Sequence, residues 1–440
     1  MLIDLARRTA DRSMIVPLLA AALCMAACKK ADTTAGGASG GSGSSGTASG
    51  GSGSGGAASG GGDDKIVVGV LTDMSGLYKD LGGPGSVIAA QMAIDEVGGK
   101  IAGMPIELVS GDHQNKPDIG SSVARGWLDT KGVDVIVDVP TSSVALAVSD
   151  VVRNSNKVFL ASGAGSSRLT GDACSPNTIH WAYDTWALAN ATGREIVKNG
   201  GDSWFFLTAD YEFGKTLEAD VTKVVETSGG KVLGTVKHPL NTADFSSFLL
   251  QAQSSKAKIV GLANAGGDTI NSIKQAAEFG IVSKGQKLAG LLVFIADINA
   301  LGLATAHGTI LSESFYWDRD DKTREWSKKF AAKHDGAMPT MIHAGVYTSL
   351  LHYFKAIAEL KSAKDGKAVV AKMEAMPTDD SLFGKGSIDP NGRKRHAMYV
   401  YEVKTPEESK AKWDYYKLIR EVPPDQAFRA PADSHCPLVK

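Results

Sequence analysis

The sequence predicts an α/β fold of two similar lobes, each built on a mainly parallel sheet that is covered by helices. Two observations support this prediction. Short apolar, β-branched runs alternate with amphipathic stretches from residue 65 onward, and the alternation starts again near residue 186. Strands that follow one another through helices imply right-handed crossovers. The chain has 440 residues, which is long enough for two domains.

The first set of elements begins with the apolar run at 66–71. Val87, Ala90 and Ile94 fall on one face of the helix that follows, and Gly98-Gly99 ends it. The β-branched runs between the helices are typical of strands that are buried on both faces. We expect strands at 66–71, 106–110, 133–137 and 158–160, and helices at 86–97, 121–130 and 144–153.

The second set repeats this pattern, and a longer helical stretch follows it. We expect strands at 204–208, 231–236, 259–263 and 288–294, and helices at 186–198, 215–227, 245–254 and 269–279. The helical stretch at 324–376 needs a sheet to cover. The segments 396–403 and 412–419 have the alternation of a hairpin.

The first 28 residues have the pattern of an export signal. Arg7, Arg8 and Arg12 precede an apolar run at 14–27. That run is shorter than the roughly 20 residues that a spanning helix needs, and it suits a signal peptide. The sequence MAAC at 25–28 resembles a bacterial lipobox, although Met25 is not the usual leucine. We therefore predict a signal peptide at 1–28 with lipid on Cys28; the alternative is an ordinary cleaved signal.

A tether is predicted at 29–64. Residues 33–62 are Thr, Ala, Gly and Ser throughout. Such a chain cannot bury a core and behaves as a flexible coil with a reach of roughly 30 Å. A link between a membrane anchor and a folded body is its natural use, which supports the lipid anchor independently of the lipobox.

Charge and cysteine content narrow the class of protein. The formal net charge is −1, and no basic stripe indicates nucleic-acid binding. Beyond the signal, no apolar run reaches the length of a membrane span. Cys174 and Cys436 remain in the body, and in an oxidising compartment we expect them to form a disulfide that holds the C-terminal tail. Two buried free thiols are the alternative.

Several motifs, in order, resemble one known family. They are KIVVGVLTDMSG at 65–76, AIDEVGGKIAG at 93–103, LVSGDHQ at 108–114 and DYEFG at 210–214. Their order and spacing are similar to those of type I periplasmic solute-binding proteins, the leucine/isoleucine/valine-binding family. The resemblance extends from residue 65 to about residue 404.

The resemblance implies two Rossmann-like lobes joined by a three-strand hinge. Lobe one is expected to comprise 65–183 plus about 314–380, and lobe two 184–313 plus about 381–440. The implied function is that of an extracytoplasmic, periplasmic protein that captures a small solute and delivers it to an ABC permease in the inner membrane. The ligand is expected at the carboxyl ends of the strands, where closure about the hinge buries it.

Lobe one is expected to hold a ligand carboxylate at two loops. Ser142 and Ser143 follow a strand and open a helix, where hydroxyl and N–H groups bind anions; helix capping is the alternative use. The second loop follows the next strand and is rich in glycine, so its backbone N–H groups are open to a carboxylate. The family uses the matching residues as ligand contacts: Ala164, Gly165 and Ser166.

Lobe two is expected to close on the ligand from the other side. The family pattern places an aromatic residue before Gly214, hence Phe213, and we add Tyr211. Asp297 lies near the family's ammonium-binding acid, with Asp268 as a competitor; an Asp of this kind more often caps a helix.

Further aromatic residues are candidates for the cleft. Tyr183 lies where the chain should cross between the lobes, next to Asp184, and Tyr78 lies in the loop after the first strand. Trp181, Tyr316 and Trp317 are weaker candidates, because buried tryptophans usually belong to the core.

The ligand class stays open at this point. Small residues stand at Asn264-Ala265, where the family has a tyrosine, so a larger or non-amino ligand is an alternative. Branched-chain or other apolar amino acids are the first choice, and aromatic carboxylates or amides are the second. The fold also serves in sensors that present their closed state to a membrane receptor.

An enzymatic function is not expected. The histidines do not pair at metal-ligand spacing on an expected helix, and the sequence has neither a zinc-protease helix nor a Walker loop. Gly163-x-Gly165 follows a strand, but the third glycine of a dinucleotide fingerprint is replaced by Arg168. We therefore expect no catalytic residues, no bound metal and no cofactor.

Overall fold

The structure is a computed structural model that describes residues 65–440. The predicted signal peptide at 1–28, its Cys28, and the predicted tether at 29–64 lie outside the described residues. Among the described helices, none is both long and apolar enough to cross a membrane.

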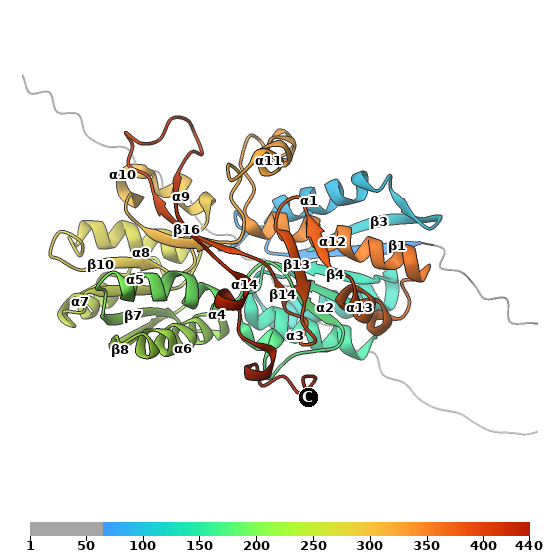
Figure 1. Cartoon of the computed structure of the whole chain (residues 1–440), viewed down its shortest axis with the longest axis horizontal. Coiled ribbons are helices and arrows are strands. Elements are labelled where there is room, and N and C mark those ends of the chain that lie inside the picture. The colour runs from blue at the N-terminus through green and yellow to red at the C-terminus, as the bar shows by residue number, and fades with distance from the viewer. Residues whose placement is uncertain (1–64) are drawn as a thin grey trace, which may run out of the picture. The chain divides into compact units, whose positions relative to one another are not determined.

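The first sheet is formed by the N-terminal part of the body (Figure 1). Its strand order is β2-β3-β1-β4-β5-β6, with parallel pairing except between β2 and β3. Neighbouring strands pair in register, for example Val68 with Val135 and Val135 with Val158. The strands are β1 (Ile66–Thr72), β2 (Lys100–Ile101), β3 (Met104–Asp112), β4 (Val135–Asp138), β5 (Val158–Ala161) and β6 (Thr178–His180).

Both faces of the first sheet are covered, because successive side chains of a strand point to opposite faces. On β1, Val68 and Val70 pack into the core with α1 and α12, while Val67 and Leu71 pack into the core with α3. The helices are α1 (Gly83–Glu96), α2 (Pro117–Gly126), η1 (Trp127–Lys131), α3 (Ser142–Asn154), η2 (Ser167–Thr170), α11 (Asp321–Lys333), α12 (Met341–Leu360) and α13 (Gly366–Ala375).

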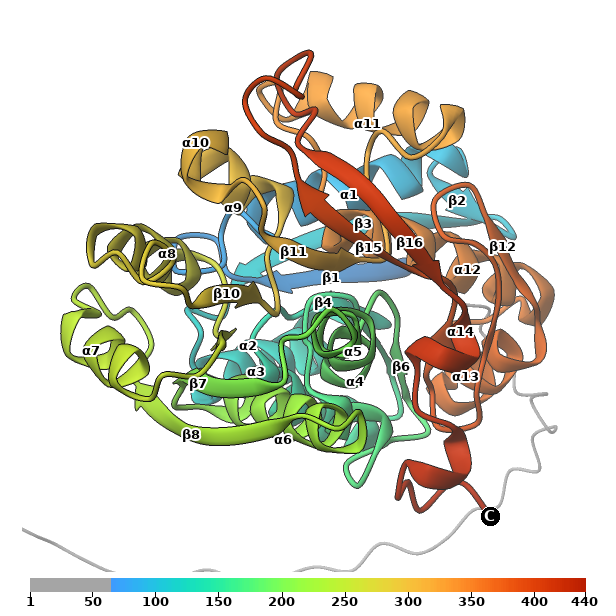
Figure 2. The same ribbon diagram turned by 60° about the vertical axis from the view of Figure 1, so that its left-hand side comes forward.

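The second sheet has the order β16-β15-β11-β10-β9-β7-β8. From β11 to β8 the pairing is parallel, and β15 and β16 add an antiparallel edge. Figure 2 shows that edge in red beside β11. The strands are β7 (Ser203–Ala209), β8 (Lys231–His238), β9 (Ile259–Ala263), β10 (Lys287–Gly290), β11 (Ile310–Glu313), β15 (Met398–Val403) and β16 (Tyr416–Val422).

Helices also flank the second sheet. Val221 and Val224 of α6 pack with Trp204 and Phe206 of β7, whereas Leu249 of α7 packs on the other core. The helices are α4 (Thr185–Leu188), η3 (Ala189–Gly193), α5 (Arg194–Lys198), α6 (Glu212–Thr227), α7 (Ser246–Ser254), α8 (Gly267–Glu278), α9 (Ile295–Leu301), α10 (Leu303–Ala306), α14 (Pro424–Ala427) and η4 (Pro431–Asp433).

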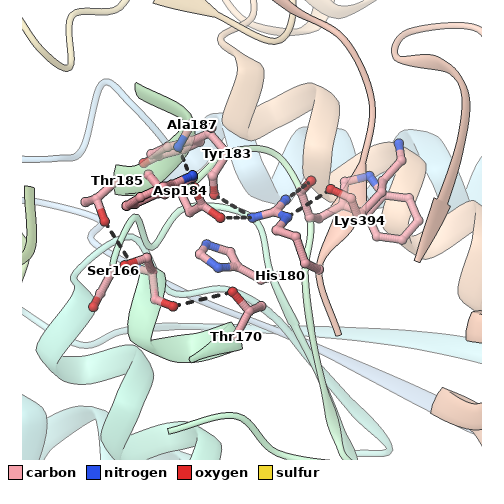
Figure 3. Close-up of polar contacts among 12 residues, drawn as sticks. Ser166, Thr170, His180, Tyr183, Asp184, Thr185, Ala187 and Lys394 are labelled. Atoms are coloured by element: carbon pink, nitrogen blue, oxygen red, sulfur yellow. Dashed lines mark hydrogen bonds and ion pairs between the residues drawn. The ribbon is translucent and has the colours of Figure 1, made fainter. Parts of the chain in front are cut away.

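Within residues 65–440 the chain passes between the two sheets after β6, after β11 and after β14. A small antiparallel sheet, β12 (Thr378–Asp380), β13 (Gly384–Ile388) and β14 (Lys394–Arg395), precedes the last passage. The buried guanidinium of Arg393, just before β14, joins the last passage to the first. It donates to the carbonyls of Trp181 and Tyr183, and it pairs with Asp184 at 3.4 Å (Figure 3).

The C-terminal tail is fastened to the first lobe. Cys174 and Cys436 form a disulfide with their Cα atoms 5.7 Å apart. Cys174 lies between η2 and β6, and Cys436 lies beyond η4. Both cysteines are buried, so the tail lies against the protein beside this loop.

The predicted α/β fold of two parallel-sheet lobes is confirmed, with differences in detail. The expected strand at 288–294 ends at Gly290, and residues 291–294 lead into α9. The second hairpin strand begins at Tyr416, and the 324–376 stretch is divided among α11, α12 and α13. The exact lobe boundaries stay a prediction; β13 and β14 adjoin the first sheet, where Arg393 bridges His180.

Candidate functional site

The carboxyl ends of β4 and β5 bring the two predicted lobe-one loops together. Ser142 is the first residue of α3, and its side chain is fully buried. Its Oγ accepts hydrogen bonds from the backbone N–H groups of Gly165 at 3.3 Å and Ser166 at 3.1 Å. These hydrogen bonds join the start of α3 to the loop after β5, so a hydroxyl and two N–H groups meet at one point.

The remaining lobe-one candidates frame this point. Ala164 is buried, and its carbonyl accepts from Nε2 of His180 at 2.7 Å. The Ser166 hydroxyl caps η2 through the N–H of Arg168. Ser143 lies in the first turn of α3 and is partly exposed. The structure thus brings the predicted residues from both loops to one edge of the sheet.

Lobe two supplies aromatic side chains from the end of β7 and the start of α6. Phe213 is buried and lies against Gly165, where an added Cβ would come within 2.7 Å of the Phe213 ring. Tyr211 precedes α6, and its ring lies 6.2 Å from that of Phe213. Gly165 has to be a glycine here, because any side chain would collide with Phe213 from the opposite lobe.

The two lobes touch across the cleft. The hydroxyls of Tyr78 and Tyr211 are 2.6 Å apart, and the Ser166 hydroxyl donates to Oε1 of Glu212 at 2.9 Å. Arg168 adds an ion pair to Glu212 at 3.3 Å. Burial raises the pKa of both Tyr211 and Tyr78 well above the usual value for a phenol, so both side chains stay neutral. The structure therefore represents a closed arrangement of the lobes.

Tyr183 lies between the lobes, as expected from its place before α4. Its hydroxyl donates to the carbonyl of Gly163 at 2.5 Å, and its ring meets that of Phe294 edge-on at 6.2 Å. Its neighbour Asp184 caps α4 by accepting from the N–H of Ala187 (Figure 3). Of the weaker candidates, Tyr316 and Trp317 both donate to the carbonyl of Trp413, away from these loops.

Asp297, the expected ammonium partner, is turned toward its own helix. Its Oδ2 accepts from the N–H of Phe294 at 2.9 Å, which caps α9. Burial raises its pKa to about 7. The competing Asp268 accepts from the N–H groups of Asn241 and Thr242, and burial raises its pKa to about 6. Each acid has the capping use that is common for such residues, and the role of either toward a ligand stays a prediction.

The structure adds residues that sequence reasoning missed. Glu212 reaches Ser166 across the cleft, and Phe294 packs on Tyr183. Asp73 shapes the loop before α1 by accepting from the N–H groups of Gly76 and Tyr78. The DYEFG motif contained the signal for Glu212, but its partner in the other lobe is far away in the sequence.

Histidines and metal-ligand clusters do not mark a second site in residues 65–440. The described residues hold no group of three His, Cys, Asp or Glu side chains suited to a metal ion. His343 is typical: its Nε2 contacts the carbonyl of Gly82 at 2.8 Å, and burial lowers its pKa to about 3. His343 therefore stabilises the packing of α12 against the start of α1.

Known proteins resemble this chain in sequence and in fold. A family model described as periplasmic binding protein matches residues 65–411. The crystal structure of a periplasmic binding protein from Burkholderia mallei is 50% identical, with a TM-score of 0.83, and the match covers 86% of this chain and 100% of that one.

Two further relatives have names that state a ligand class. A branched chain amino acid ABC transporter periplasmic ligand-binding protein from Burkholderia xenovorans LB400 is 38% identical with a TM-score of 0.77, over 86% of this chain and 100% of that one. Leu/Ile/Val-binding protein homolog 6 of Brucella melitensis is 24% identical over 77% of this chain and 88% of that protein.

Proposed function

We propose that this chain, which belongs to the periplasmic binding protein family, captures a small carboxylated solute between its two lobes and delivers it to an ABC permease. Members of the family are extracytoplasmic proteins that bind small molecules, which supports a small-molecule ligand and an extracytoplasmic location for this chain. One observation supports a carboxylate as the group that the protein binds. The hydroxyl of Ser142 and the N–H groups of Gly165 and Ser166 meet at the carboxyl ends of β4 and β5, and Phe213 of the other lobe lies against Gly165.

The first choice of solute is a branched-chain or other apolar amino acid. The names of the relatives in Burkholderia xenovorans and Brucella melitensis support this class. The wall that faces the donor set is apolar, because Phe213 and Phe294 are fully or almost fully buried there beside Tyr183. An aliphatic side chain on a carboxylate would fill such a site favourably.

Aromatic carboxylates are a second candidate, favoured by the rings around the cleft. Tyr78, Tyr183, Tyr211, Phe213 and Phe294 come from both lobes and lie at ring or hydroxyl contact with one another. Aromatic rings favour offset or edge-on contacts with another ring at centroid distances of roughly 4.5–7 Å, so these side chains suit contact with an aromatic ligand that enters while the lobes are open.

Capture requires closure and no chemical step. Tyr78 with Tyr211, and Ser166 with Glu212, join the lobes in the closed arrangement. A ligand stabilises that arrangement only by contacts it makes better there than in the open one. Asp268 and Asp297 both accept from backbone N–H groups, as helix-capping and loop-shaping acids do, which supports a binding role.

A lipid anchor through Cys28 remains part of this proposal. The lipobox-like residues 25–28 and the Gly/Ser-rich 29–64 segment support it. Metabolic labelling with a fatty-acid analogue should mark the wild-type protein but not Cys28→Ala. Equal labelling of both would contradict the anchor.

A thermal-shift screen of the purified protein tests the solute class. Amino acids, aromatic acids, amides and short dicarboxylates form the panel. A ligand at about 100 times its Kd adds roughly 2.7 kcal/mol to the free energy of unfolding, which raises Tm visibly. We expect shifts with apolar amino acids or aromatic carboxylates and none with the matching amides. Shifts with amides alone would overturn the carboxylate assignment.

A further inference from the structure

The last residue of β4 has an unusual backbone. Asp138 has φ of 80° and Val139 has φ of 56°. Left-handed backbone is uncommon outside glycine, and for a β-branched residue such as Val139 it is a genuine outlier. Strain of this kind persists only where the surrounding structure holds it, and it collects at binding and active sites. This strained backbone sets the direction in which the chain continues after Asp138 at the end of the strand.

The Asp138 carboxyl is buried between two backbone segments. Its side chain is fully inaccessible to solvent. A Cβ at Gly82 would lie 2.8 Å from its Oδ2, and a Cβ at Gly163 would lie 2.4 Å from its Oδ1. The absence of side chains at these glycines therefore makes room for the carboxyl beside the loop that carries Gly165 and Ser166.

Neither oxygen of Asp138 has a hydrogen-bond partner among the described residues. The hydroxyls of Thr72 and Ser86 lie beside it, and the Oγ of Ser86 is likewise without a partner. Burial raises the pKa of Asp138 to about 6. The two hydroxyls favour the charged form and offset part of that rise, although neither is in hydrogen-bond geometry with the carboxyl. Buried polar groups are almost always paired, so an unpaired carboxyl requires an explanation.

Ordinary structural uses of a buried acid do not account for Asp138. Asp138 does not cap α1, because the first N–H of that helix, that of Gly83, donates to the hydroxyl of Thr72 at 3.0 Å. Asp134, just before the same strand, shows what a structural acid looks like here. It accepts from the N–H of Val67 at 3.0 Å and pairs with Lys157 at 2.6 Å. No ion pair of Asp138 occurs within residues 65–440.

The position of Asp138 points to the ligand. β1 and β4 are neighbours, but α1 packs on one face of the sheet and α3 on the other. Crevices that hold ligands in open α/β sheets lie at such a switch point, outside the carboxyl ends of the strands. Asp138 is also close enough to the phenol of Tyr183 to add to the rise in its pKa, after burial as the main cause.

We infer that Asp138 accepts a hydrogen bond from a donor group of the solute, an ammonium or a hydroxyl, while Ser142, Gly165 and Ser166 hold its carboxylate. This inference rests on the proposed function and narrows its solute class. The favoured ligand is a carboxylate that also carries a donor, and a plain aliphatic or aromatic acid leaves Asp138 buried without a partner. That unpaired group costs affinity, as sites built for a hydrogen bond reject analogues that lack it.

Calorimetric titration of the purified protein with two ligand pairs tests the inference. Leucine and 4-methylpentanoate differ in the ammonium, and 4-hydroxybenzoate and benzoate differ in the hydroxyl. We expect wild type to bind the donor-bearing member of at least one pair tenfold or more tightly. Which pair shows the preference identifies the donor. In Asp138→Asn the preference should fall at least fivefold, and the donor-free acid should keep its affinity within about threefold.

Two further variants keep the outcome interpretable. Asp138→Gly removes the carboxyl at a backbone position that suits glycine, so it should fold and lose the same preference. Asp134→Asn alters a buried acid at the other end of the strand and should leave the preference unchanged.

Failure of the inference and failure of the proposed function give different results in these titrations. An unchanged preference in folded Asp138→Asn and Asp138→Gly, or no preference in wild type that binds these acids, overturns the inference and leaves the proposed function standing. Wild type that binds none of the four acids overturns the proposed solute class, and the inference falls with it.

Discussion

The phenol oxygens of Tyr78 and Tyr211 lie 2.6 Å apart, one from each side of the cleft. Tyr78 follows β1 of the first sheet and Tyr211 follows β7 of the second, so this contact depends on closure of the lobes. It is a partly buried hydrogen bond between neutral groups, because burial raises the pKa of both phenols. Closure of the lobes therefore forms a hydrogen bond, between Tyr78 and Tyr211, that neither lobe can make alone.

Tyr211→Phe should weaken ligand binding without unfolding the protein. A neutral hydrogen bond contributes about 0.5–1.5 kcal/mol, which corresponds to roughly a two- to tenfold rise in Kd. Titration calorimetry with the best ligand of the screen measures it. Tyr415→Phe is the control, because the Tyr415 hydroxyl bonds Asn299 within lobe two. Equal effects of both variants would refute the role in closure.

Ser142→Ala should weaken every carboxylate ligand about tenfold, because two N–H groups lose the oxygen that aligns them. The double variant Ser142→Ala/Ser143→Ala tests the whole segment, and Ser143→Ala alone separates the contribution of the partly exposed hydroxyl. Binding is measured by calorimetry, and folding by circular dichroism. Unchanged affinity in the folded double variant would remove this segment from the ligand site.

The sequence predicted much of the fold because its signals are local. Apolar β-branched runs such as 259–263 became strands with the expected bounds, since they are buried on both faces. β6 was missed because it is short and contains His180, which is buried only through contacts made by distant residues. β11 was missed for a similar reason, since Glu313 ends it and is buried against Tyr416.

The site was predictable in part. Ser142, Gly165 and Ser166 follow strands, so their meeting at one edge follows from a parallel sheet. The partnership of Ser166 with Glu212 depends on how the lobes meet, which no local pattern encodes. Asp138 was hidden inside an apolar run, and its strained φ is visible only in three dimensions.

Arg393→Met should destabilise the protein strongly. Arg393 and Asp184 are both buried, with 2% and 3% of their side chains exposed, and the guanidinium also donates to three backbone carbonyls. Removing it leaves Asp184 without its charge partner, which costs roughly 3–5 kcal/mol. Urea denaturation measures the loss. Arg153→Ala, in the exposed pair with Asp150, should cost less than about 1 kcal/mol. Similar losses in both variants would show that burial does not matter here.

Removing the disulfide should loosen the C-terminal tail. Cys174 and Cys436 are 262 positions apart, so the bond closes a long loop in the unfolded chain. Loss of a native disulfide typically costs about 2–5 kcal/mol. Cys174→Ser/Cys436→Ser should lower the urea midpoint and expose the segment after residue 423 to proteolysis. Wild type in reducing agent should behave in the same way. A variant with an unaltered midpoint and an intact tail would contradict the prediction.

Asp297 should make stability depend on pH in a defined window. Burial raises its pKa from an ordinary 3.8 to about 7, so between these values the folded state holds a proton that the unfolded state has released. The free energy of unfolding therefore falls as pH rises from about 4 to about 7.

The variant Asp297→Asn tests this pH dependence, because its side chain cannot titrate and its Oδ1 still accepts from the N–H of Phe294. The variant should lose less stability than wild type between pH 4.5 and 7.5, as measured by urea denaturation at each pH. Asp379→Asn, at an exposed position, controls for the loss of a charge. Parallel stability curves for wild type and Asp297→Asn would show that this carboxyl titrates alike in the folded and unfolded states.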